Sequence, residues 1–254
     1  MDSDDDLGSV SRLALPAPDA VVRYAAHDDG LVDVHLPVGG ATPAPLVLLL
    51  HGGFWKQAYD RRHTRAAAAA LAVEGFVVAT PEYRRVGGAG GWPTTAQDVD
   101  DVVKAAPRLL ADLGVATERT TVLGHSAGGH LALWLANQGH ELDRVVGLAP
   151  VGDLRTAARA RLGDGATQAL LGGEPEEQPE RYDEADPLTR LGTRPRCAVV
   201  VVHGSADEVV PVSNSQGLAA QRPFVDLRVL DGADHFDVID PTSSAWPAVL
   251  AAVR

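Results

Sequence analysis

The chain has 254 residues, of which 45% are hydrophobic, enough to bury one large core, and its formal net charge is −12 at pH 7. With 34 acidic against 22 basic residues, the composition argues against a partner that is a nucleic acid or an anionic membrane. The single cysteine, Cys197, excludes an internal disulfide, and we expect a small buried residue there rather than a nucleophile.

The amino terminus is acidic, with Asp2 directly after Met1, whereas a secretory signal peptide would begin with basic residues. No run approaches the roughly 18 apolar residues of a membrane span. We therefore expect a loose tail over residues 1–18, one domain over residues 19–254, and a soluble, cytoplasmic protein without a membrane partner.

Short apolar runs alternate with helical stretches along the rest of the chain. Strands are predicted over residues 21–26, 31–36, 45–50, 76–80, 120–124, 145–149, 198–202 and 224–230. Most of these runs are apolar on both faces, which is typical of a parallel sheet covered by helices on both sides. The pattern predicts an α/β fold with a mainly parallel sheet of about eight strands.

Helices are predicted between these strands, over residues 61–74, 94–113, 126–138 and 245–253. Residues 152–194 break the alternation because they carry many glycines, prolines and charges. We expect this segment to form a small cap over the site, with one helix over residues 157–171.

A nucleophile motif follows the strand predicted over residues 120–124. Gly124-His125-Ser126-Ala127-Gly128 fits G-x-S-x-G, and the stretch after it is predicted to be helical. A strand, a sharp turn and a helix form the context in which this motif presents a reactive serine. The sequence therefore predicts Ser126 as nucleophile, with the backbone N–H of Ala127 as an oxyanion donor.

A serine nucleophile needs a base, and the base needs a carboxylate to orient it. Asp207 follows the strand over residues 198–202, and His235 follows the last predicted strand. Serine, acid and histidine then occur in the order of an α/β-hydrolase. Asp153 and Glu208 remain alternative acids, although Asp207 is preferred.

A second glycine-rich segment, His51-Gly52-Gly53-Phe54-Trp55, follows the strand over residues 45–50. Glycine lets a backbone approach a substrate carbonyl, so Gly52, Gly53 and Phe54 are predicted to complete the oxyanion site. We expect His51 to be structural and Trp55 to form a wall of the substrate pocket.

No metal or cofactor is predicted. The chain lacks H-E-x-x-H, clustered cysteines and an EF-hand loop, and Gly87-Gly88-Ala89-Gly90-Gly91 lacks the lysine and serine of a phosphate-binding loop. Arg84 and Arg85 are candidate cations for a substrate carboxylate only because they follow a strand.

Together, His51-Gly52-Gly53-Phe54-Trp55 and Gly124 to His130 resemble the H-G-G-x-W serine hydrolases, which include the kynurenine formamidases, or arylformamidases. The resemblance covers residues 44–250 and extends to esterases and lipases with H-G-G-G, where Phe54 is replaced by glycine. It implies a small-molecule acyl substrate, an ester or arylamide such as N-formylkynurenine, cleaved through an acyl-enzyme.

Two other functions stay open. The first is a general short-chain carboxylesterase with the same residues, and the second is a catalytically silent protein that binds a small ligand on this fold. The silent protein would usually lack one of the three catalytic positions, and all three are filled here. The sequence leaves the oligomeric state open, with a homodimer as one option.

Overall fold

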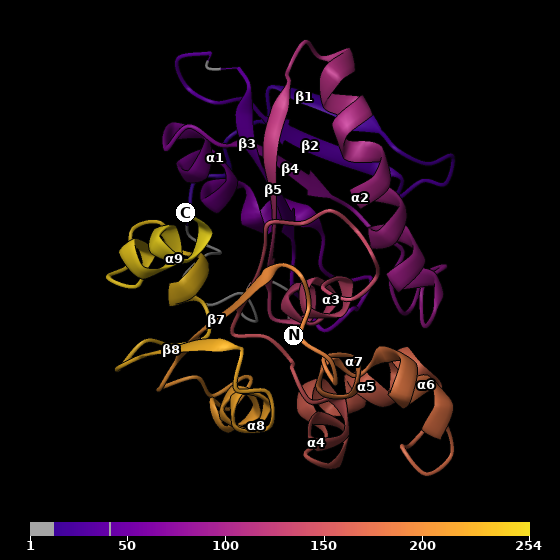
Figure 1. Ribbon diagram of the computed structural model, residues 1–254. Helices are drawn as coiled ribbons and strands as arrows, with labels where there is room; N and C mark the ends of the chain where they lie inside the picture. Colours follow the sequence, from indigo (N-terminus) through magenta and orange to yellow (C-terminus); the bar gives the residue numbers. More distant parts are fainter. Residues whose placement is uncertain (1–12, 41) are drawn as a thin grey trace.

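The computed structural model describes residues 13–40 and 42–254, so most of the predicted tail over residues 1–18 lies outside the described part (Figure 1). The strands form one sheet in the order β1-β2-β4-β3-β5-β6-β7-β8. Their bounds are β1 Ala20–Arg23, β2 Leu31–His35, β3 Ala44–Leu50, β4 Val77–Pro81, β5 Thr117–His125, β6 Arg144–Leu148, β7 Ala198–Gly204 and β8 Asp226–Leu230. Strands β3 to β8 run parallel, and β2 is antiparallel to both of its neighbours, as expected for a mainly parallel sheet.

The apolar strands are explained by helices on both faces of the sheet. In β3, Leu46 and Leu48 face one buried core, and Val47 and Leu49 face the other. Helices α2 (Thr94–Asp112), α3 (Ala127–Leu135) and α8 (Ser213–Gln221) pack into the first core, and α1 (Arg65–Val73) and α9 (Trp246–Val253) pack into the second (Figure 1). A strand buried on both faces needs no polar alternation, which is why these runs read as continuous hydrophobic segments.

Two short 3-10 helices accompany these elements. The 3-10 helix η2 (Arg61–Thr64) precedes α1, so the helix predicted over residues 61–74 begins with a tighter turn. A second 3-10 helix, η3 (Asp237–Ile239), follows β8. Within the described residues, no helix is both long and apolar enough to cross a membrane.

The segment between β6 and β7 contains four helices, drawn at the lower right of Figure 1. They are α4 (Leu154–Arg159), α5 (Leu162–Leu171), α6 (Pro179–Ala185) and α7 (Pro187–Arg190). The prediction of one helix over residues 157–171 is wrong because Arg161 has a left-handed φ of 51°, and Gly163, Asp164 and Gly165 are left-handed as well. A right-handed helix cannot continue through such residues.

The left-handed stretch of α5 contacts the loop after β3. A Cβ built on Gly163 would lie 2.6 Å from Cγ of Phe54, in the loop after β3. The helical segment therefore packs onto the loop that follows a central strand. Because β3, β5, β7 and β8 are parallel, the loops after them meet at one end of the sheet, where open α/β sheets place their ligands.

Candidate active site

Ser126 occupies the tight turn between β5 and α3. Its backbone has φ 54° and ψ −117°, outside the regions that a serine usually occupies. The turn fits only because its neighbours lack side chains: a Cβ on Gly124 would lie 2.1 Å from the Gly128 carbonyl oxygen, and one on Gly128 would lie 2.2 Å from that of Leu50. The G-x-S-x-G sequence thus produces a strained turn that holds the Ser126 hydroxyl at the end of β5.

His235 and Asp207 meet across the loops after β8 and β7. Nδ1 of His235 lies 2.6 Å from Oδ2 of Asp207, so Nδ1–H donates to the carboxylate, and Nε2 is the ring nitrogen that can accept a proton. Ser126 and His235 are 2% and 3% exposed and line the same cavity. The structure therefore brings together the three residues that the motifs predicted separately.

Both carboxylate oxygens of Asp207 have hydrogen-bonding partners. Its Oδ1 accepts hydrogen bonds from the backbone N–H groups of Val209 and Val210 at 2.9 and 2.8 Å. Oδ2 also lies 3.1 Å from Nε2 of a second histidine, His203. Burial by itself raises the pKa of Asp207, but the hydrogen bonds from His203 and His235 outweigh burial and hold this pKa below its usual range. The carboxylate is therefore ionised and fixed.

Two further histidines orient this arrangement. Nδ1 of His203 lies 2.7 Å from the Ser215 hydroxyl, and Nε2 of the same ring lies 2.8 Å from the Val210 carbonyl oxygen. Because a carbonyl oxygen can only accept, Nε2 of His203 carries a proton, and this N–H also faces Asp207. Nε2 of His125 lies 2.9 Å from the carbonyl oxygen of His235, and the two rings are 4.6 Å apart. The residues that orient the candidate base thus include His125 and His203 in addition to Asp207.

The loop after β3 faces the nucleophile. A Cβ on Gly52 would lie 3.1 Å from Cβ of Ser126, so the loop and the turn are in close contact. In the part of the chain that the structure describes, no acceptor pairs with the backbone N–H groups of Gly53, Phe54 or Ala127. Such free donors beside a serine are what a developing oxyanion requires.

His51 anchors this loop to the end of β4. Its Nε2 lies 2.7 Å from Oε1 of Glu82, and its carbonyl oxygen accepts a hydrogen bond from the Tyr83 hydroxyl at 2.7 Å. Burial raises the pKa of Glu82, but His51 and Arg85 outweigh burial and lower it to about 2. His51 is fully buried, as expected of a structural residue.

The cavity beside Ser126 encloses about 200 Å³. It is lined mainly by small, aromatic and histidine residues, together with one lysine and one aspartate. Its lining residues are Gly53, Phe54, Lys56, Tyr59, His63, His125, Ser126, Gly163, Asp164, Val209, His235 and Phe236. The sequence did not single out Lys56, Tyr59, His63 or Val209, and only their closeness to the two motifs could have indicated them.

The prediction that Trp55 walls the pocket is wrong. Trp55 is 1% exposed and belongs to the main hydrophobic core, and its ring packs edge-to-face on His130 at 5.1 Å. Phe54 and Trp55 both have positive φ, 50° and 55°, so the chain reverses here and turns the Trp55 side chain inward. Phe54, its neighbour, lines the cavity instead.

The rival acids lie in other roles. Asp153 caps α4 by accepting from the Thr156 N–H at 2.9 Å, and the Glu208 side chain is exposed. Neither lines the cavity.

The candidate cations are also engaged elsewhere. Arg84 forms an ion pair with Asp98, and Arg85 pairs with Glu82 and Asp29. Neither arginine lines the cavity, so neither is placed to receive a substrate carboxylate. Residues 87–91, the glycine-rich stretch, do not line it either.

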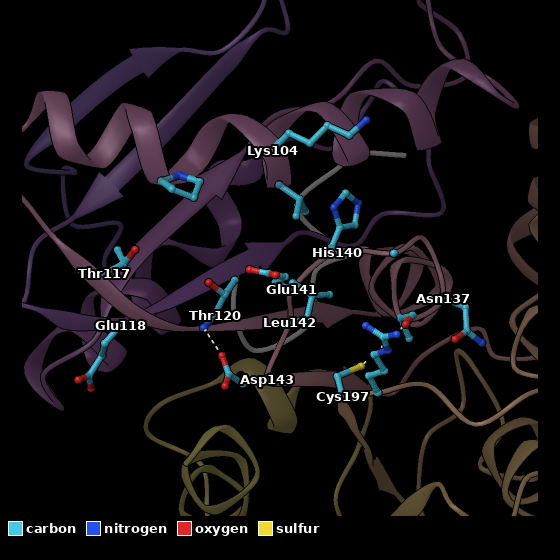
Figure 2. Close-up of a pocket in the computed structure, with 15 residues that line it drawn as sticks. Lys104, Thr117, Glu118, Thr120, Asn137, His140, Glu141, Leu142, Asp143 and Cys197 are labelled. Atoms are coloured by element: carbon cyan, nitrogen blue, oxygen red, sulfur yellow. Dashed lines mark hydrogen bonds between the residues drawn. The ribbon is translucent and has the colours of Figure 1, made fainter.

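A larger hollow of about 1140 Å³ lies at the opposite end of the strands (Figure 2). It is lined by the residues that precede or begin β5, β6 and β7, among them Thr120, Asp143 and Cys197. Cys197 is half-buried, its Sγ lies 3.9 Å from the Ala136 carbonyl oxygen, and burial raises the pKa of its thiol. In residues 13–40 and 42–254, no three histidine, cysteine, aspartate or glutamate side chains are grouped to hold a metal.

One family model, named BD-FAE, matches residues 32–221. Esterase LipC of Mycobacterium tuberculosis (strain ATCC 25618 / H37Rv) is 28% identical over 221 residues, covering 78% of this chain and 54% of LipC. The chain thus spans about half the length of this curated relative.

Solved structures share the fold at low sequence identity. A truncated carbohydrate esterase from gut microbiota is 20% identical, with a TM-score of 0.76 over 88% of this chain and 91% of that one. Esterase B from Lactobacillus rhamnosis (HN001) is 18% identical, with a TM-score of 0.76 over 98% and 86%. Thermogutta terrifontis esterase 2, solved with butyrate, is 19% identical, with a TM-score of 0.71 over 93% and 92%. The sheet order, the turn at Ser126 and the matched span lead to one assignment: the chain has the α/β-hydrolase fold and belongs to the BD-FAE family.

Proposed function

We propose that this protein is a serine carboxylesterase that hydrolyses esters of short acyl groups. The observation that carries the proposal is the meeting, at one cavity, of a strained serine, a histidine held by an ionised aspartate, and free backbone donors. Such an arrangement is the one that acyl transfer by a serine requires. The likeness to esterase LipC and to solved esterases supports the same reaction class.

In the proposed mechanism, Oγ of Ser126 attacks the ester carbonyl carbon while Nε2 of His235 takes the hydroxyl proton. Asp207 stabilises the resulting imidazolium, and the N–H groups of Ala127 and of Gly53 or Phe54 donate to the oxyanion. The tetrahedral intermediate then loses the alcohol, which receives the proton from His235. Water, deprotonated by His235, attacks the acyl-enzyme and releases the carboxylic acid and free Ser126.

The small cavity supports a short acyl group. At about 200 Å³ it falls below the 300–1,000 Å³ of ordinary ligand pockets, and the ring of Phe54 against Gly163 closes one side of it. Thermogutta terrifontis esterase 2 was solved with butyrate, and esterase B of Lactobacillus rhamnosis with a tributyrin phosphonate, which fits the same size class.

The narrower expectation of an arylformamidase stays a prediction. The relatives named above are esterases, and nothing at the cavity distinguishes a formamide from an ester. Amides are the less reactive carbonyl compounds, so we expect an arylformamide to be hydrolysed more slowly than an ester of similar size.

The test is a substrate panel. We expect kcat/KM for 4-nitrophenyl acetate and butyrate to exceed that for the dodecanoate by about tenfold or more, because a twelve-carbon chain can enter a cavity of about 200 Å³ only by displacing the side chains that line it. Formanilide should be slower than either short ester. Absence of hydrolysis of every ester, by a folded protein, would refute the proposed function, and a large preference for formanilide would restore the arylformamidase prediction.

A further inference from the structure

The chain contains two lysines, Lys56 and Lys104, beside twenty arginines. Lys104 lies on α2 and pairs with Asp100, one helical turn away. Lys56 lies at the cavity beside Ser126, and within residues 13–40 and 42–254 its ammonium forms no ion pair and no hydrogen bond. In a chain with a net charge of −12, a half-buried cation without a carboxylate partner is unusual.

The backbone of Lys56 is fixed relative to the oxyanion donors. Its N–H donates to the Gly53 carbonyl oxygen at 2.9 Å, and its carbonyl oxygen accepts from the Tyr59 N–H at 3.2 Å. Nζ lies 5.9 Å from the centre of the Phe54 ring, a cation–π contact that keeps the ammonium over the loop after β3. The ammonium therefore lies over Phe54, and Lys56 and Ser126 line the same cavity.

No other fixed positive charge lines this cavity in the described part of the chain. Burial, and then the nearby His51, lower the pKa of His63 to about 4, and burial followed by the charge of His235 lowers the pKa of His125 well below its usual range. Both rings are neutral at pH 7. Arg61, the first residue of η2, is paired with Asp33 and Glu82.

One negative charge faces the same cavity. Asp164 is exposed and comes from the left-handed stretch of α5, and within the described residues it forms no ion pair with Lys56. The cavity thus has a cation beside the oxyanion donors and a solvated carboxylate on the side of the helical segment. An anionic group on the substrate would be attracted by Lys56 and repelled, more weakly, by Asp164.

We infer that Lys56 selects esters that carry a second, negatively charged group, such as a carboxylate, in addition to the ester bond. This inference rests on the proposed esterase function and names the substrate class of that site. A lysine ammonium is a compact charge with three donors on a flexible stem, so it can reach a carboxylate on either side of the ester bond. Lys56 would act in binding, before and during acylation alike.

Two matched pairs of substrates test it. The carboxylate lies on the alcohol side in 4-acetoxybenzoate, compared with 4-methylphenyl acetate, and on the acyl side in 4-nitrophenyl hydrogen glutarate, compared with 4-nitrophenyl pentanoate. For each pair the measured quantity is the ratio of kcat/KM for the charged to the neutral ester, so that the intrinsic reactivity cancels when variants are compared.

We expect Lys56→Met to lower this ratio about tenfold for at least one pair. The pair that responds shows whether the charged group of the preferred substrate lies on the alcohol side or on the acyl side of the ester. The loss should be mainly in KM, because the ammonium binds ground state and transition state alike. Lys56→Arg should keep most of the preference. Lys104→Met, which removes the lysine that lines the hollow at the opposite end of the strands (Figure 2), should leave both ratios at the wild-type value.

Salt gives an independent measurement on the unmodified protein. Raising the ionic strength from about 0.01 M to about 1 M shortens the Debye length from about 30 Å to about 3 Å, so the wild-type ratio should fall while that of Lys56→Met changes little. If both ratios are unchanged in folded Lys56→Met while the wild-type protein hydrolyses the neutral esters, the inference about Lys56 is overturned and the proposed esterase function still stands. Loss of all ester hydrolysis in wild type would overturn the proposed function with it.

Discussion

The two hollows at opposite ends of the parallel strands differ in kind. The groove at the amino ends of β5 to β7 is large, about 1140 Å³, and several of its polar groups are paired with neighbours, such as Asp143 with the Thr120 N–H and Lys104 with Asp100. The cavity at the carboxyl ends is about 200 Å³ and contains a strained serine, free backbone N–H groups and buried histidines.

The candidate active site differs from the groove less by its volume than by the strained and unpaired groups that the folded protein keeps there at a cost in free energy. Holding Ser126 and Phe54 at positive φ costs of order 1–3 kcal/mol each, and unpaired N–H groups beside them forgo hydrogen bonds that folding normally makes. The groove at the amino ends of β5 to β7 needs no comparable loss of folding free energy. Strained and unsatisfied groups that share one cavity are therefore the better guide to chemistry.

The largest effect should come from Ser126→Ala. We expect kcat/KM for 4-nitrophenyl butyrate to fall about 10⁴-fold or more, since a serine nucleophile and its histidine act as a unit. Cys197→Ala, in the groove at the other end of the strands, should change it by less than about twofold, because the removed thiol is half-buried and outside the cavity. Comparable losses in both variants would break the contrast between the two ends.

Asp207→Asn should give the next largest effect, a fall in kcat of about 10³- to 10⁴-fold, because the amide no longer holds His235 in the required tautomer. Asp153→Asn is the matched control, since asparagine caps a helix about as well as aspartate and Asp153 caps α4. We expect its kcat to stay within about threefold of wild type. The reverse result would assign the acid to Asp153.

The buried histidines should make the fold sensitive to acid. Burial, with the charge of His51 added, lowers the pKa of His63 to about 4, and burial lowers that of His130 to about 4. Unfolding restores a pKa of about 6.5, so between pH 6.5 and 4 the unfolded chain binds more protons, and stability falls as the pH falls.

From pH 7 to pH 5 the two histidines together should remove about 3 kcal/mol from the free energy of unfolding, measured by urea denaturation. His63→Gln and His130→Gln should each flatten this dependence. A free energy that is constant over this range would show that neither ring is held neutral by burial.

The smallest effect tests the position of Trp55. Because its ring is packed in the core, Trp55→Phe should lower the free energy of unfolding by about 1–2 kcal/mol. The ratio of kcat/KM for 4-nitrophenyl butyrate to that for the acetate should stay within about threefold of wild type. A strong change in acyl preference with unchanged stability would instead return Trp55 to the pocket wall.

Local features of this molecule could be predicted from the sequence. The strands were recognisable because burial on both faces removes polar residues from runs such as 45–50, and β3 does extend over Ala44–Leu50. The turn at Ser126 was recognisable because it tolerates no side chain at Gly124 or Gly128. Chain order then indicated Asp207 and His235.

Features that depend on tertiary contacts could not be predicted. His203 and His125 approach the acid and the base only once the loops after β5, β7 and β8 meet. The contact of Gly163 with Phe54 likewise forms only in the folded chain, whereas Gly163 and Gly165 were a local signal of the helix break that the prediction did not use. Lys56 showed no pattern, and its lack of an acidic partner is visible only in the structure.

The most direct test is covalent labelling with a fluorophosphonate, which reacts with an activated serine. The site predicts one equivalent of adduct by intact-protein mass, located on Ser126 by peptide mapping, absent from Ser126→Ala and formed much more slowly in Asp207→Asn. A folded protein that takes up no label, or that carries the adduct on a residue other than Ser126, would contradict the central claim that Ser126 is the nucleophile.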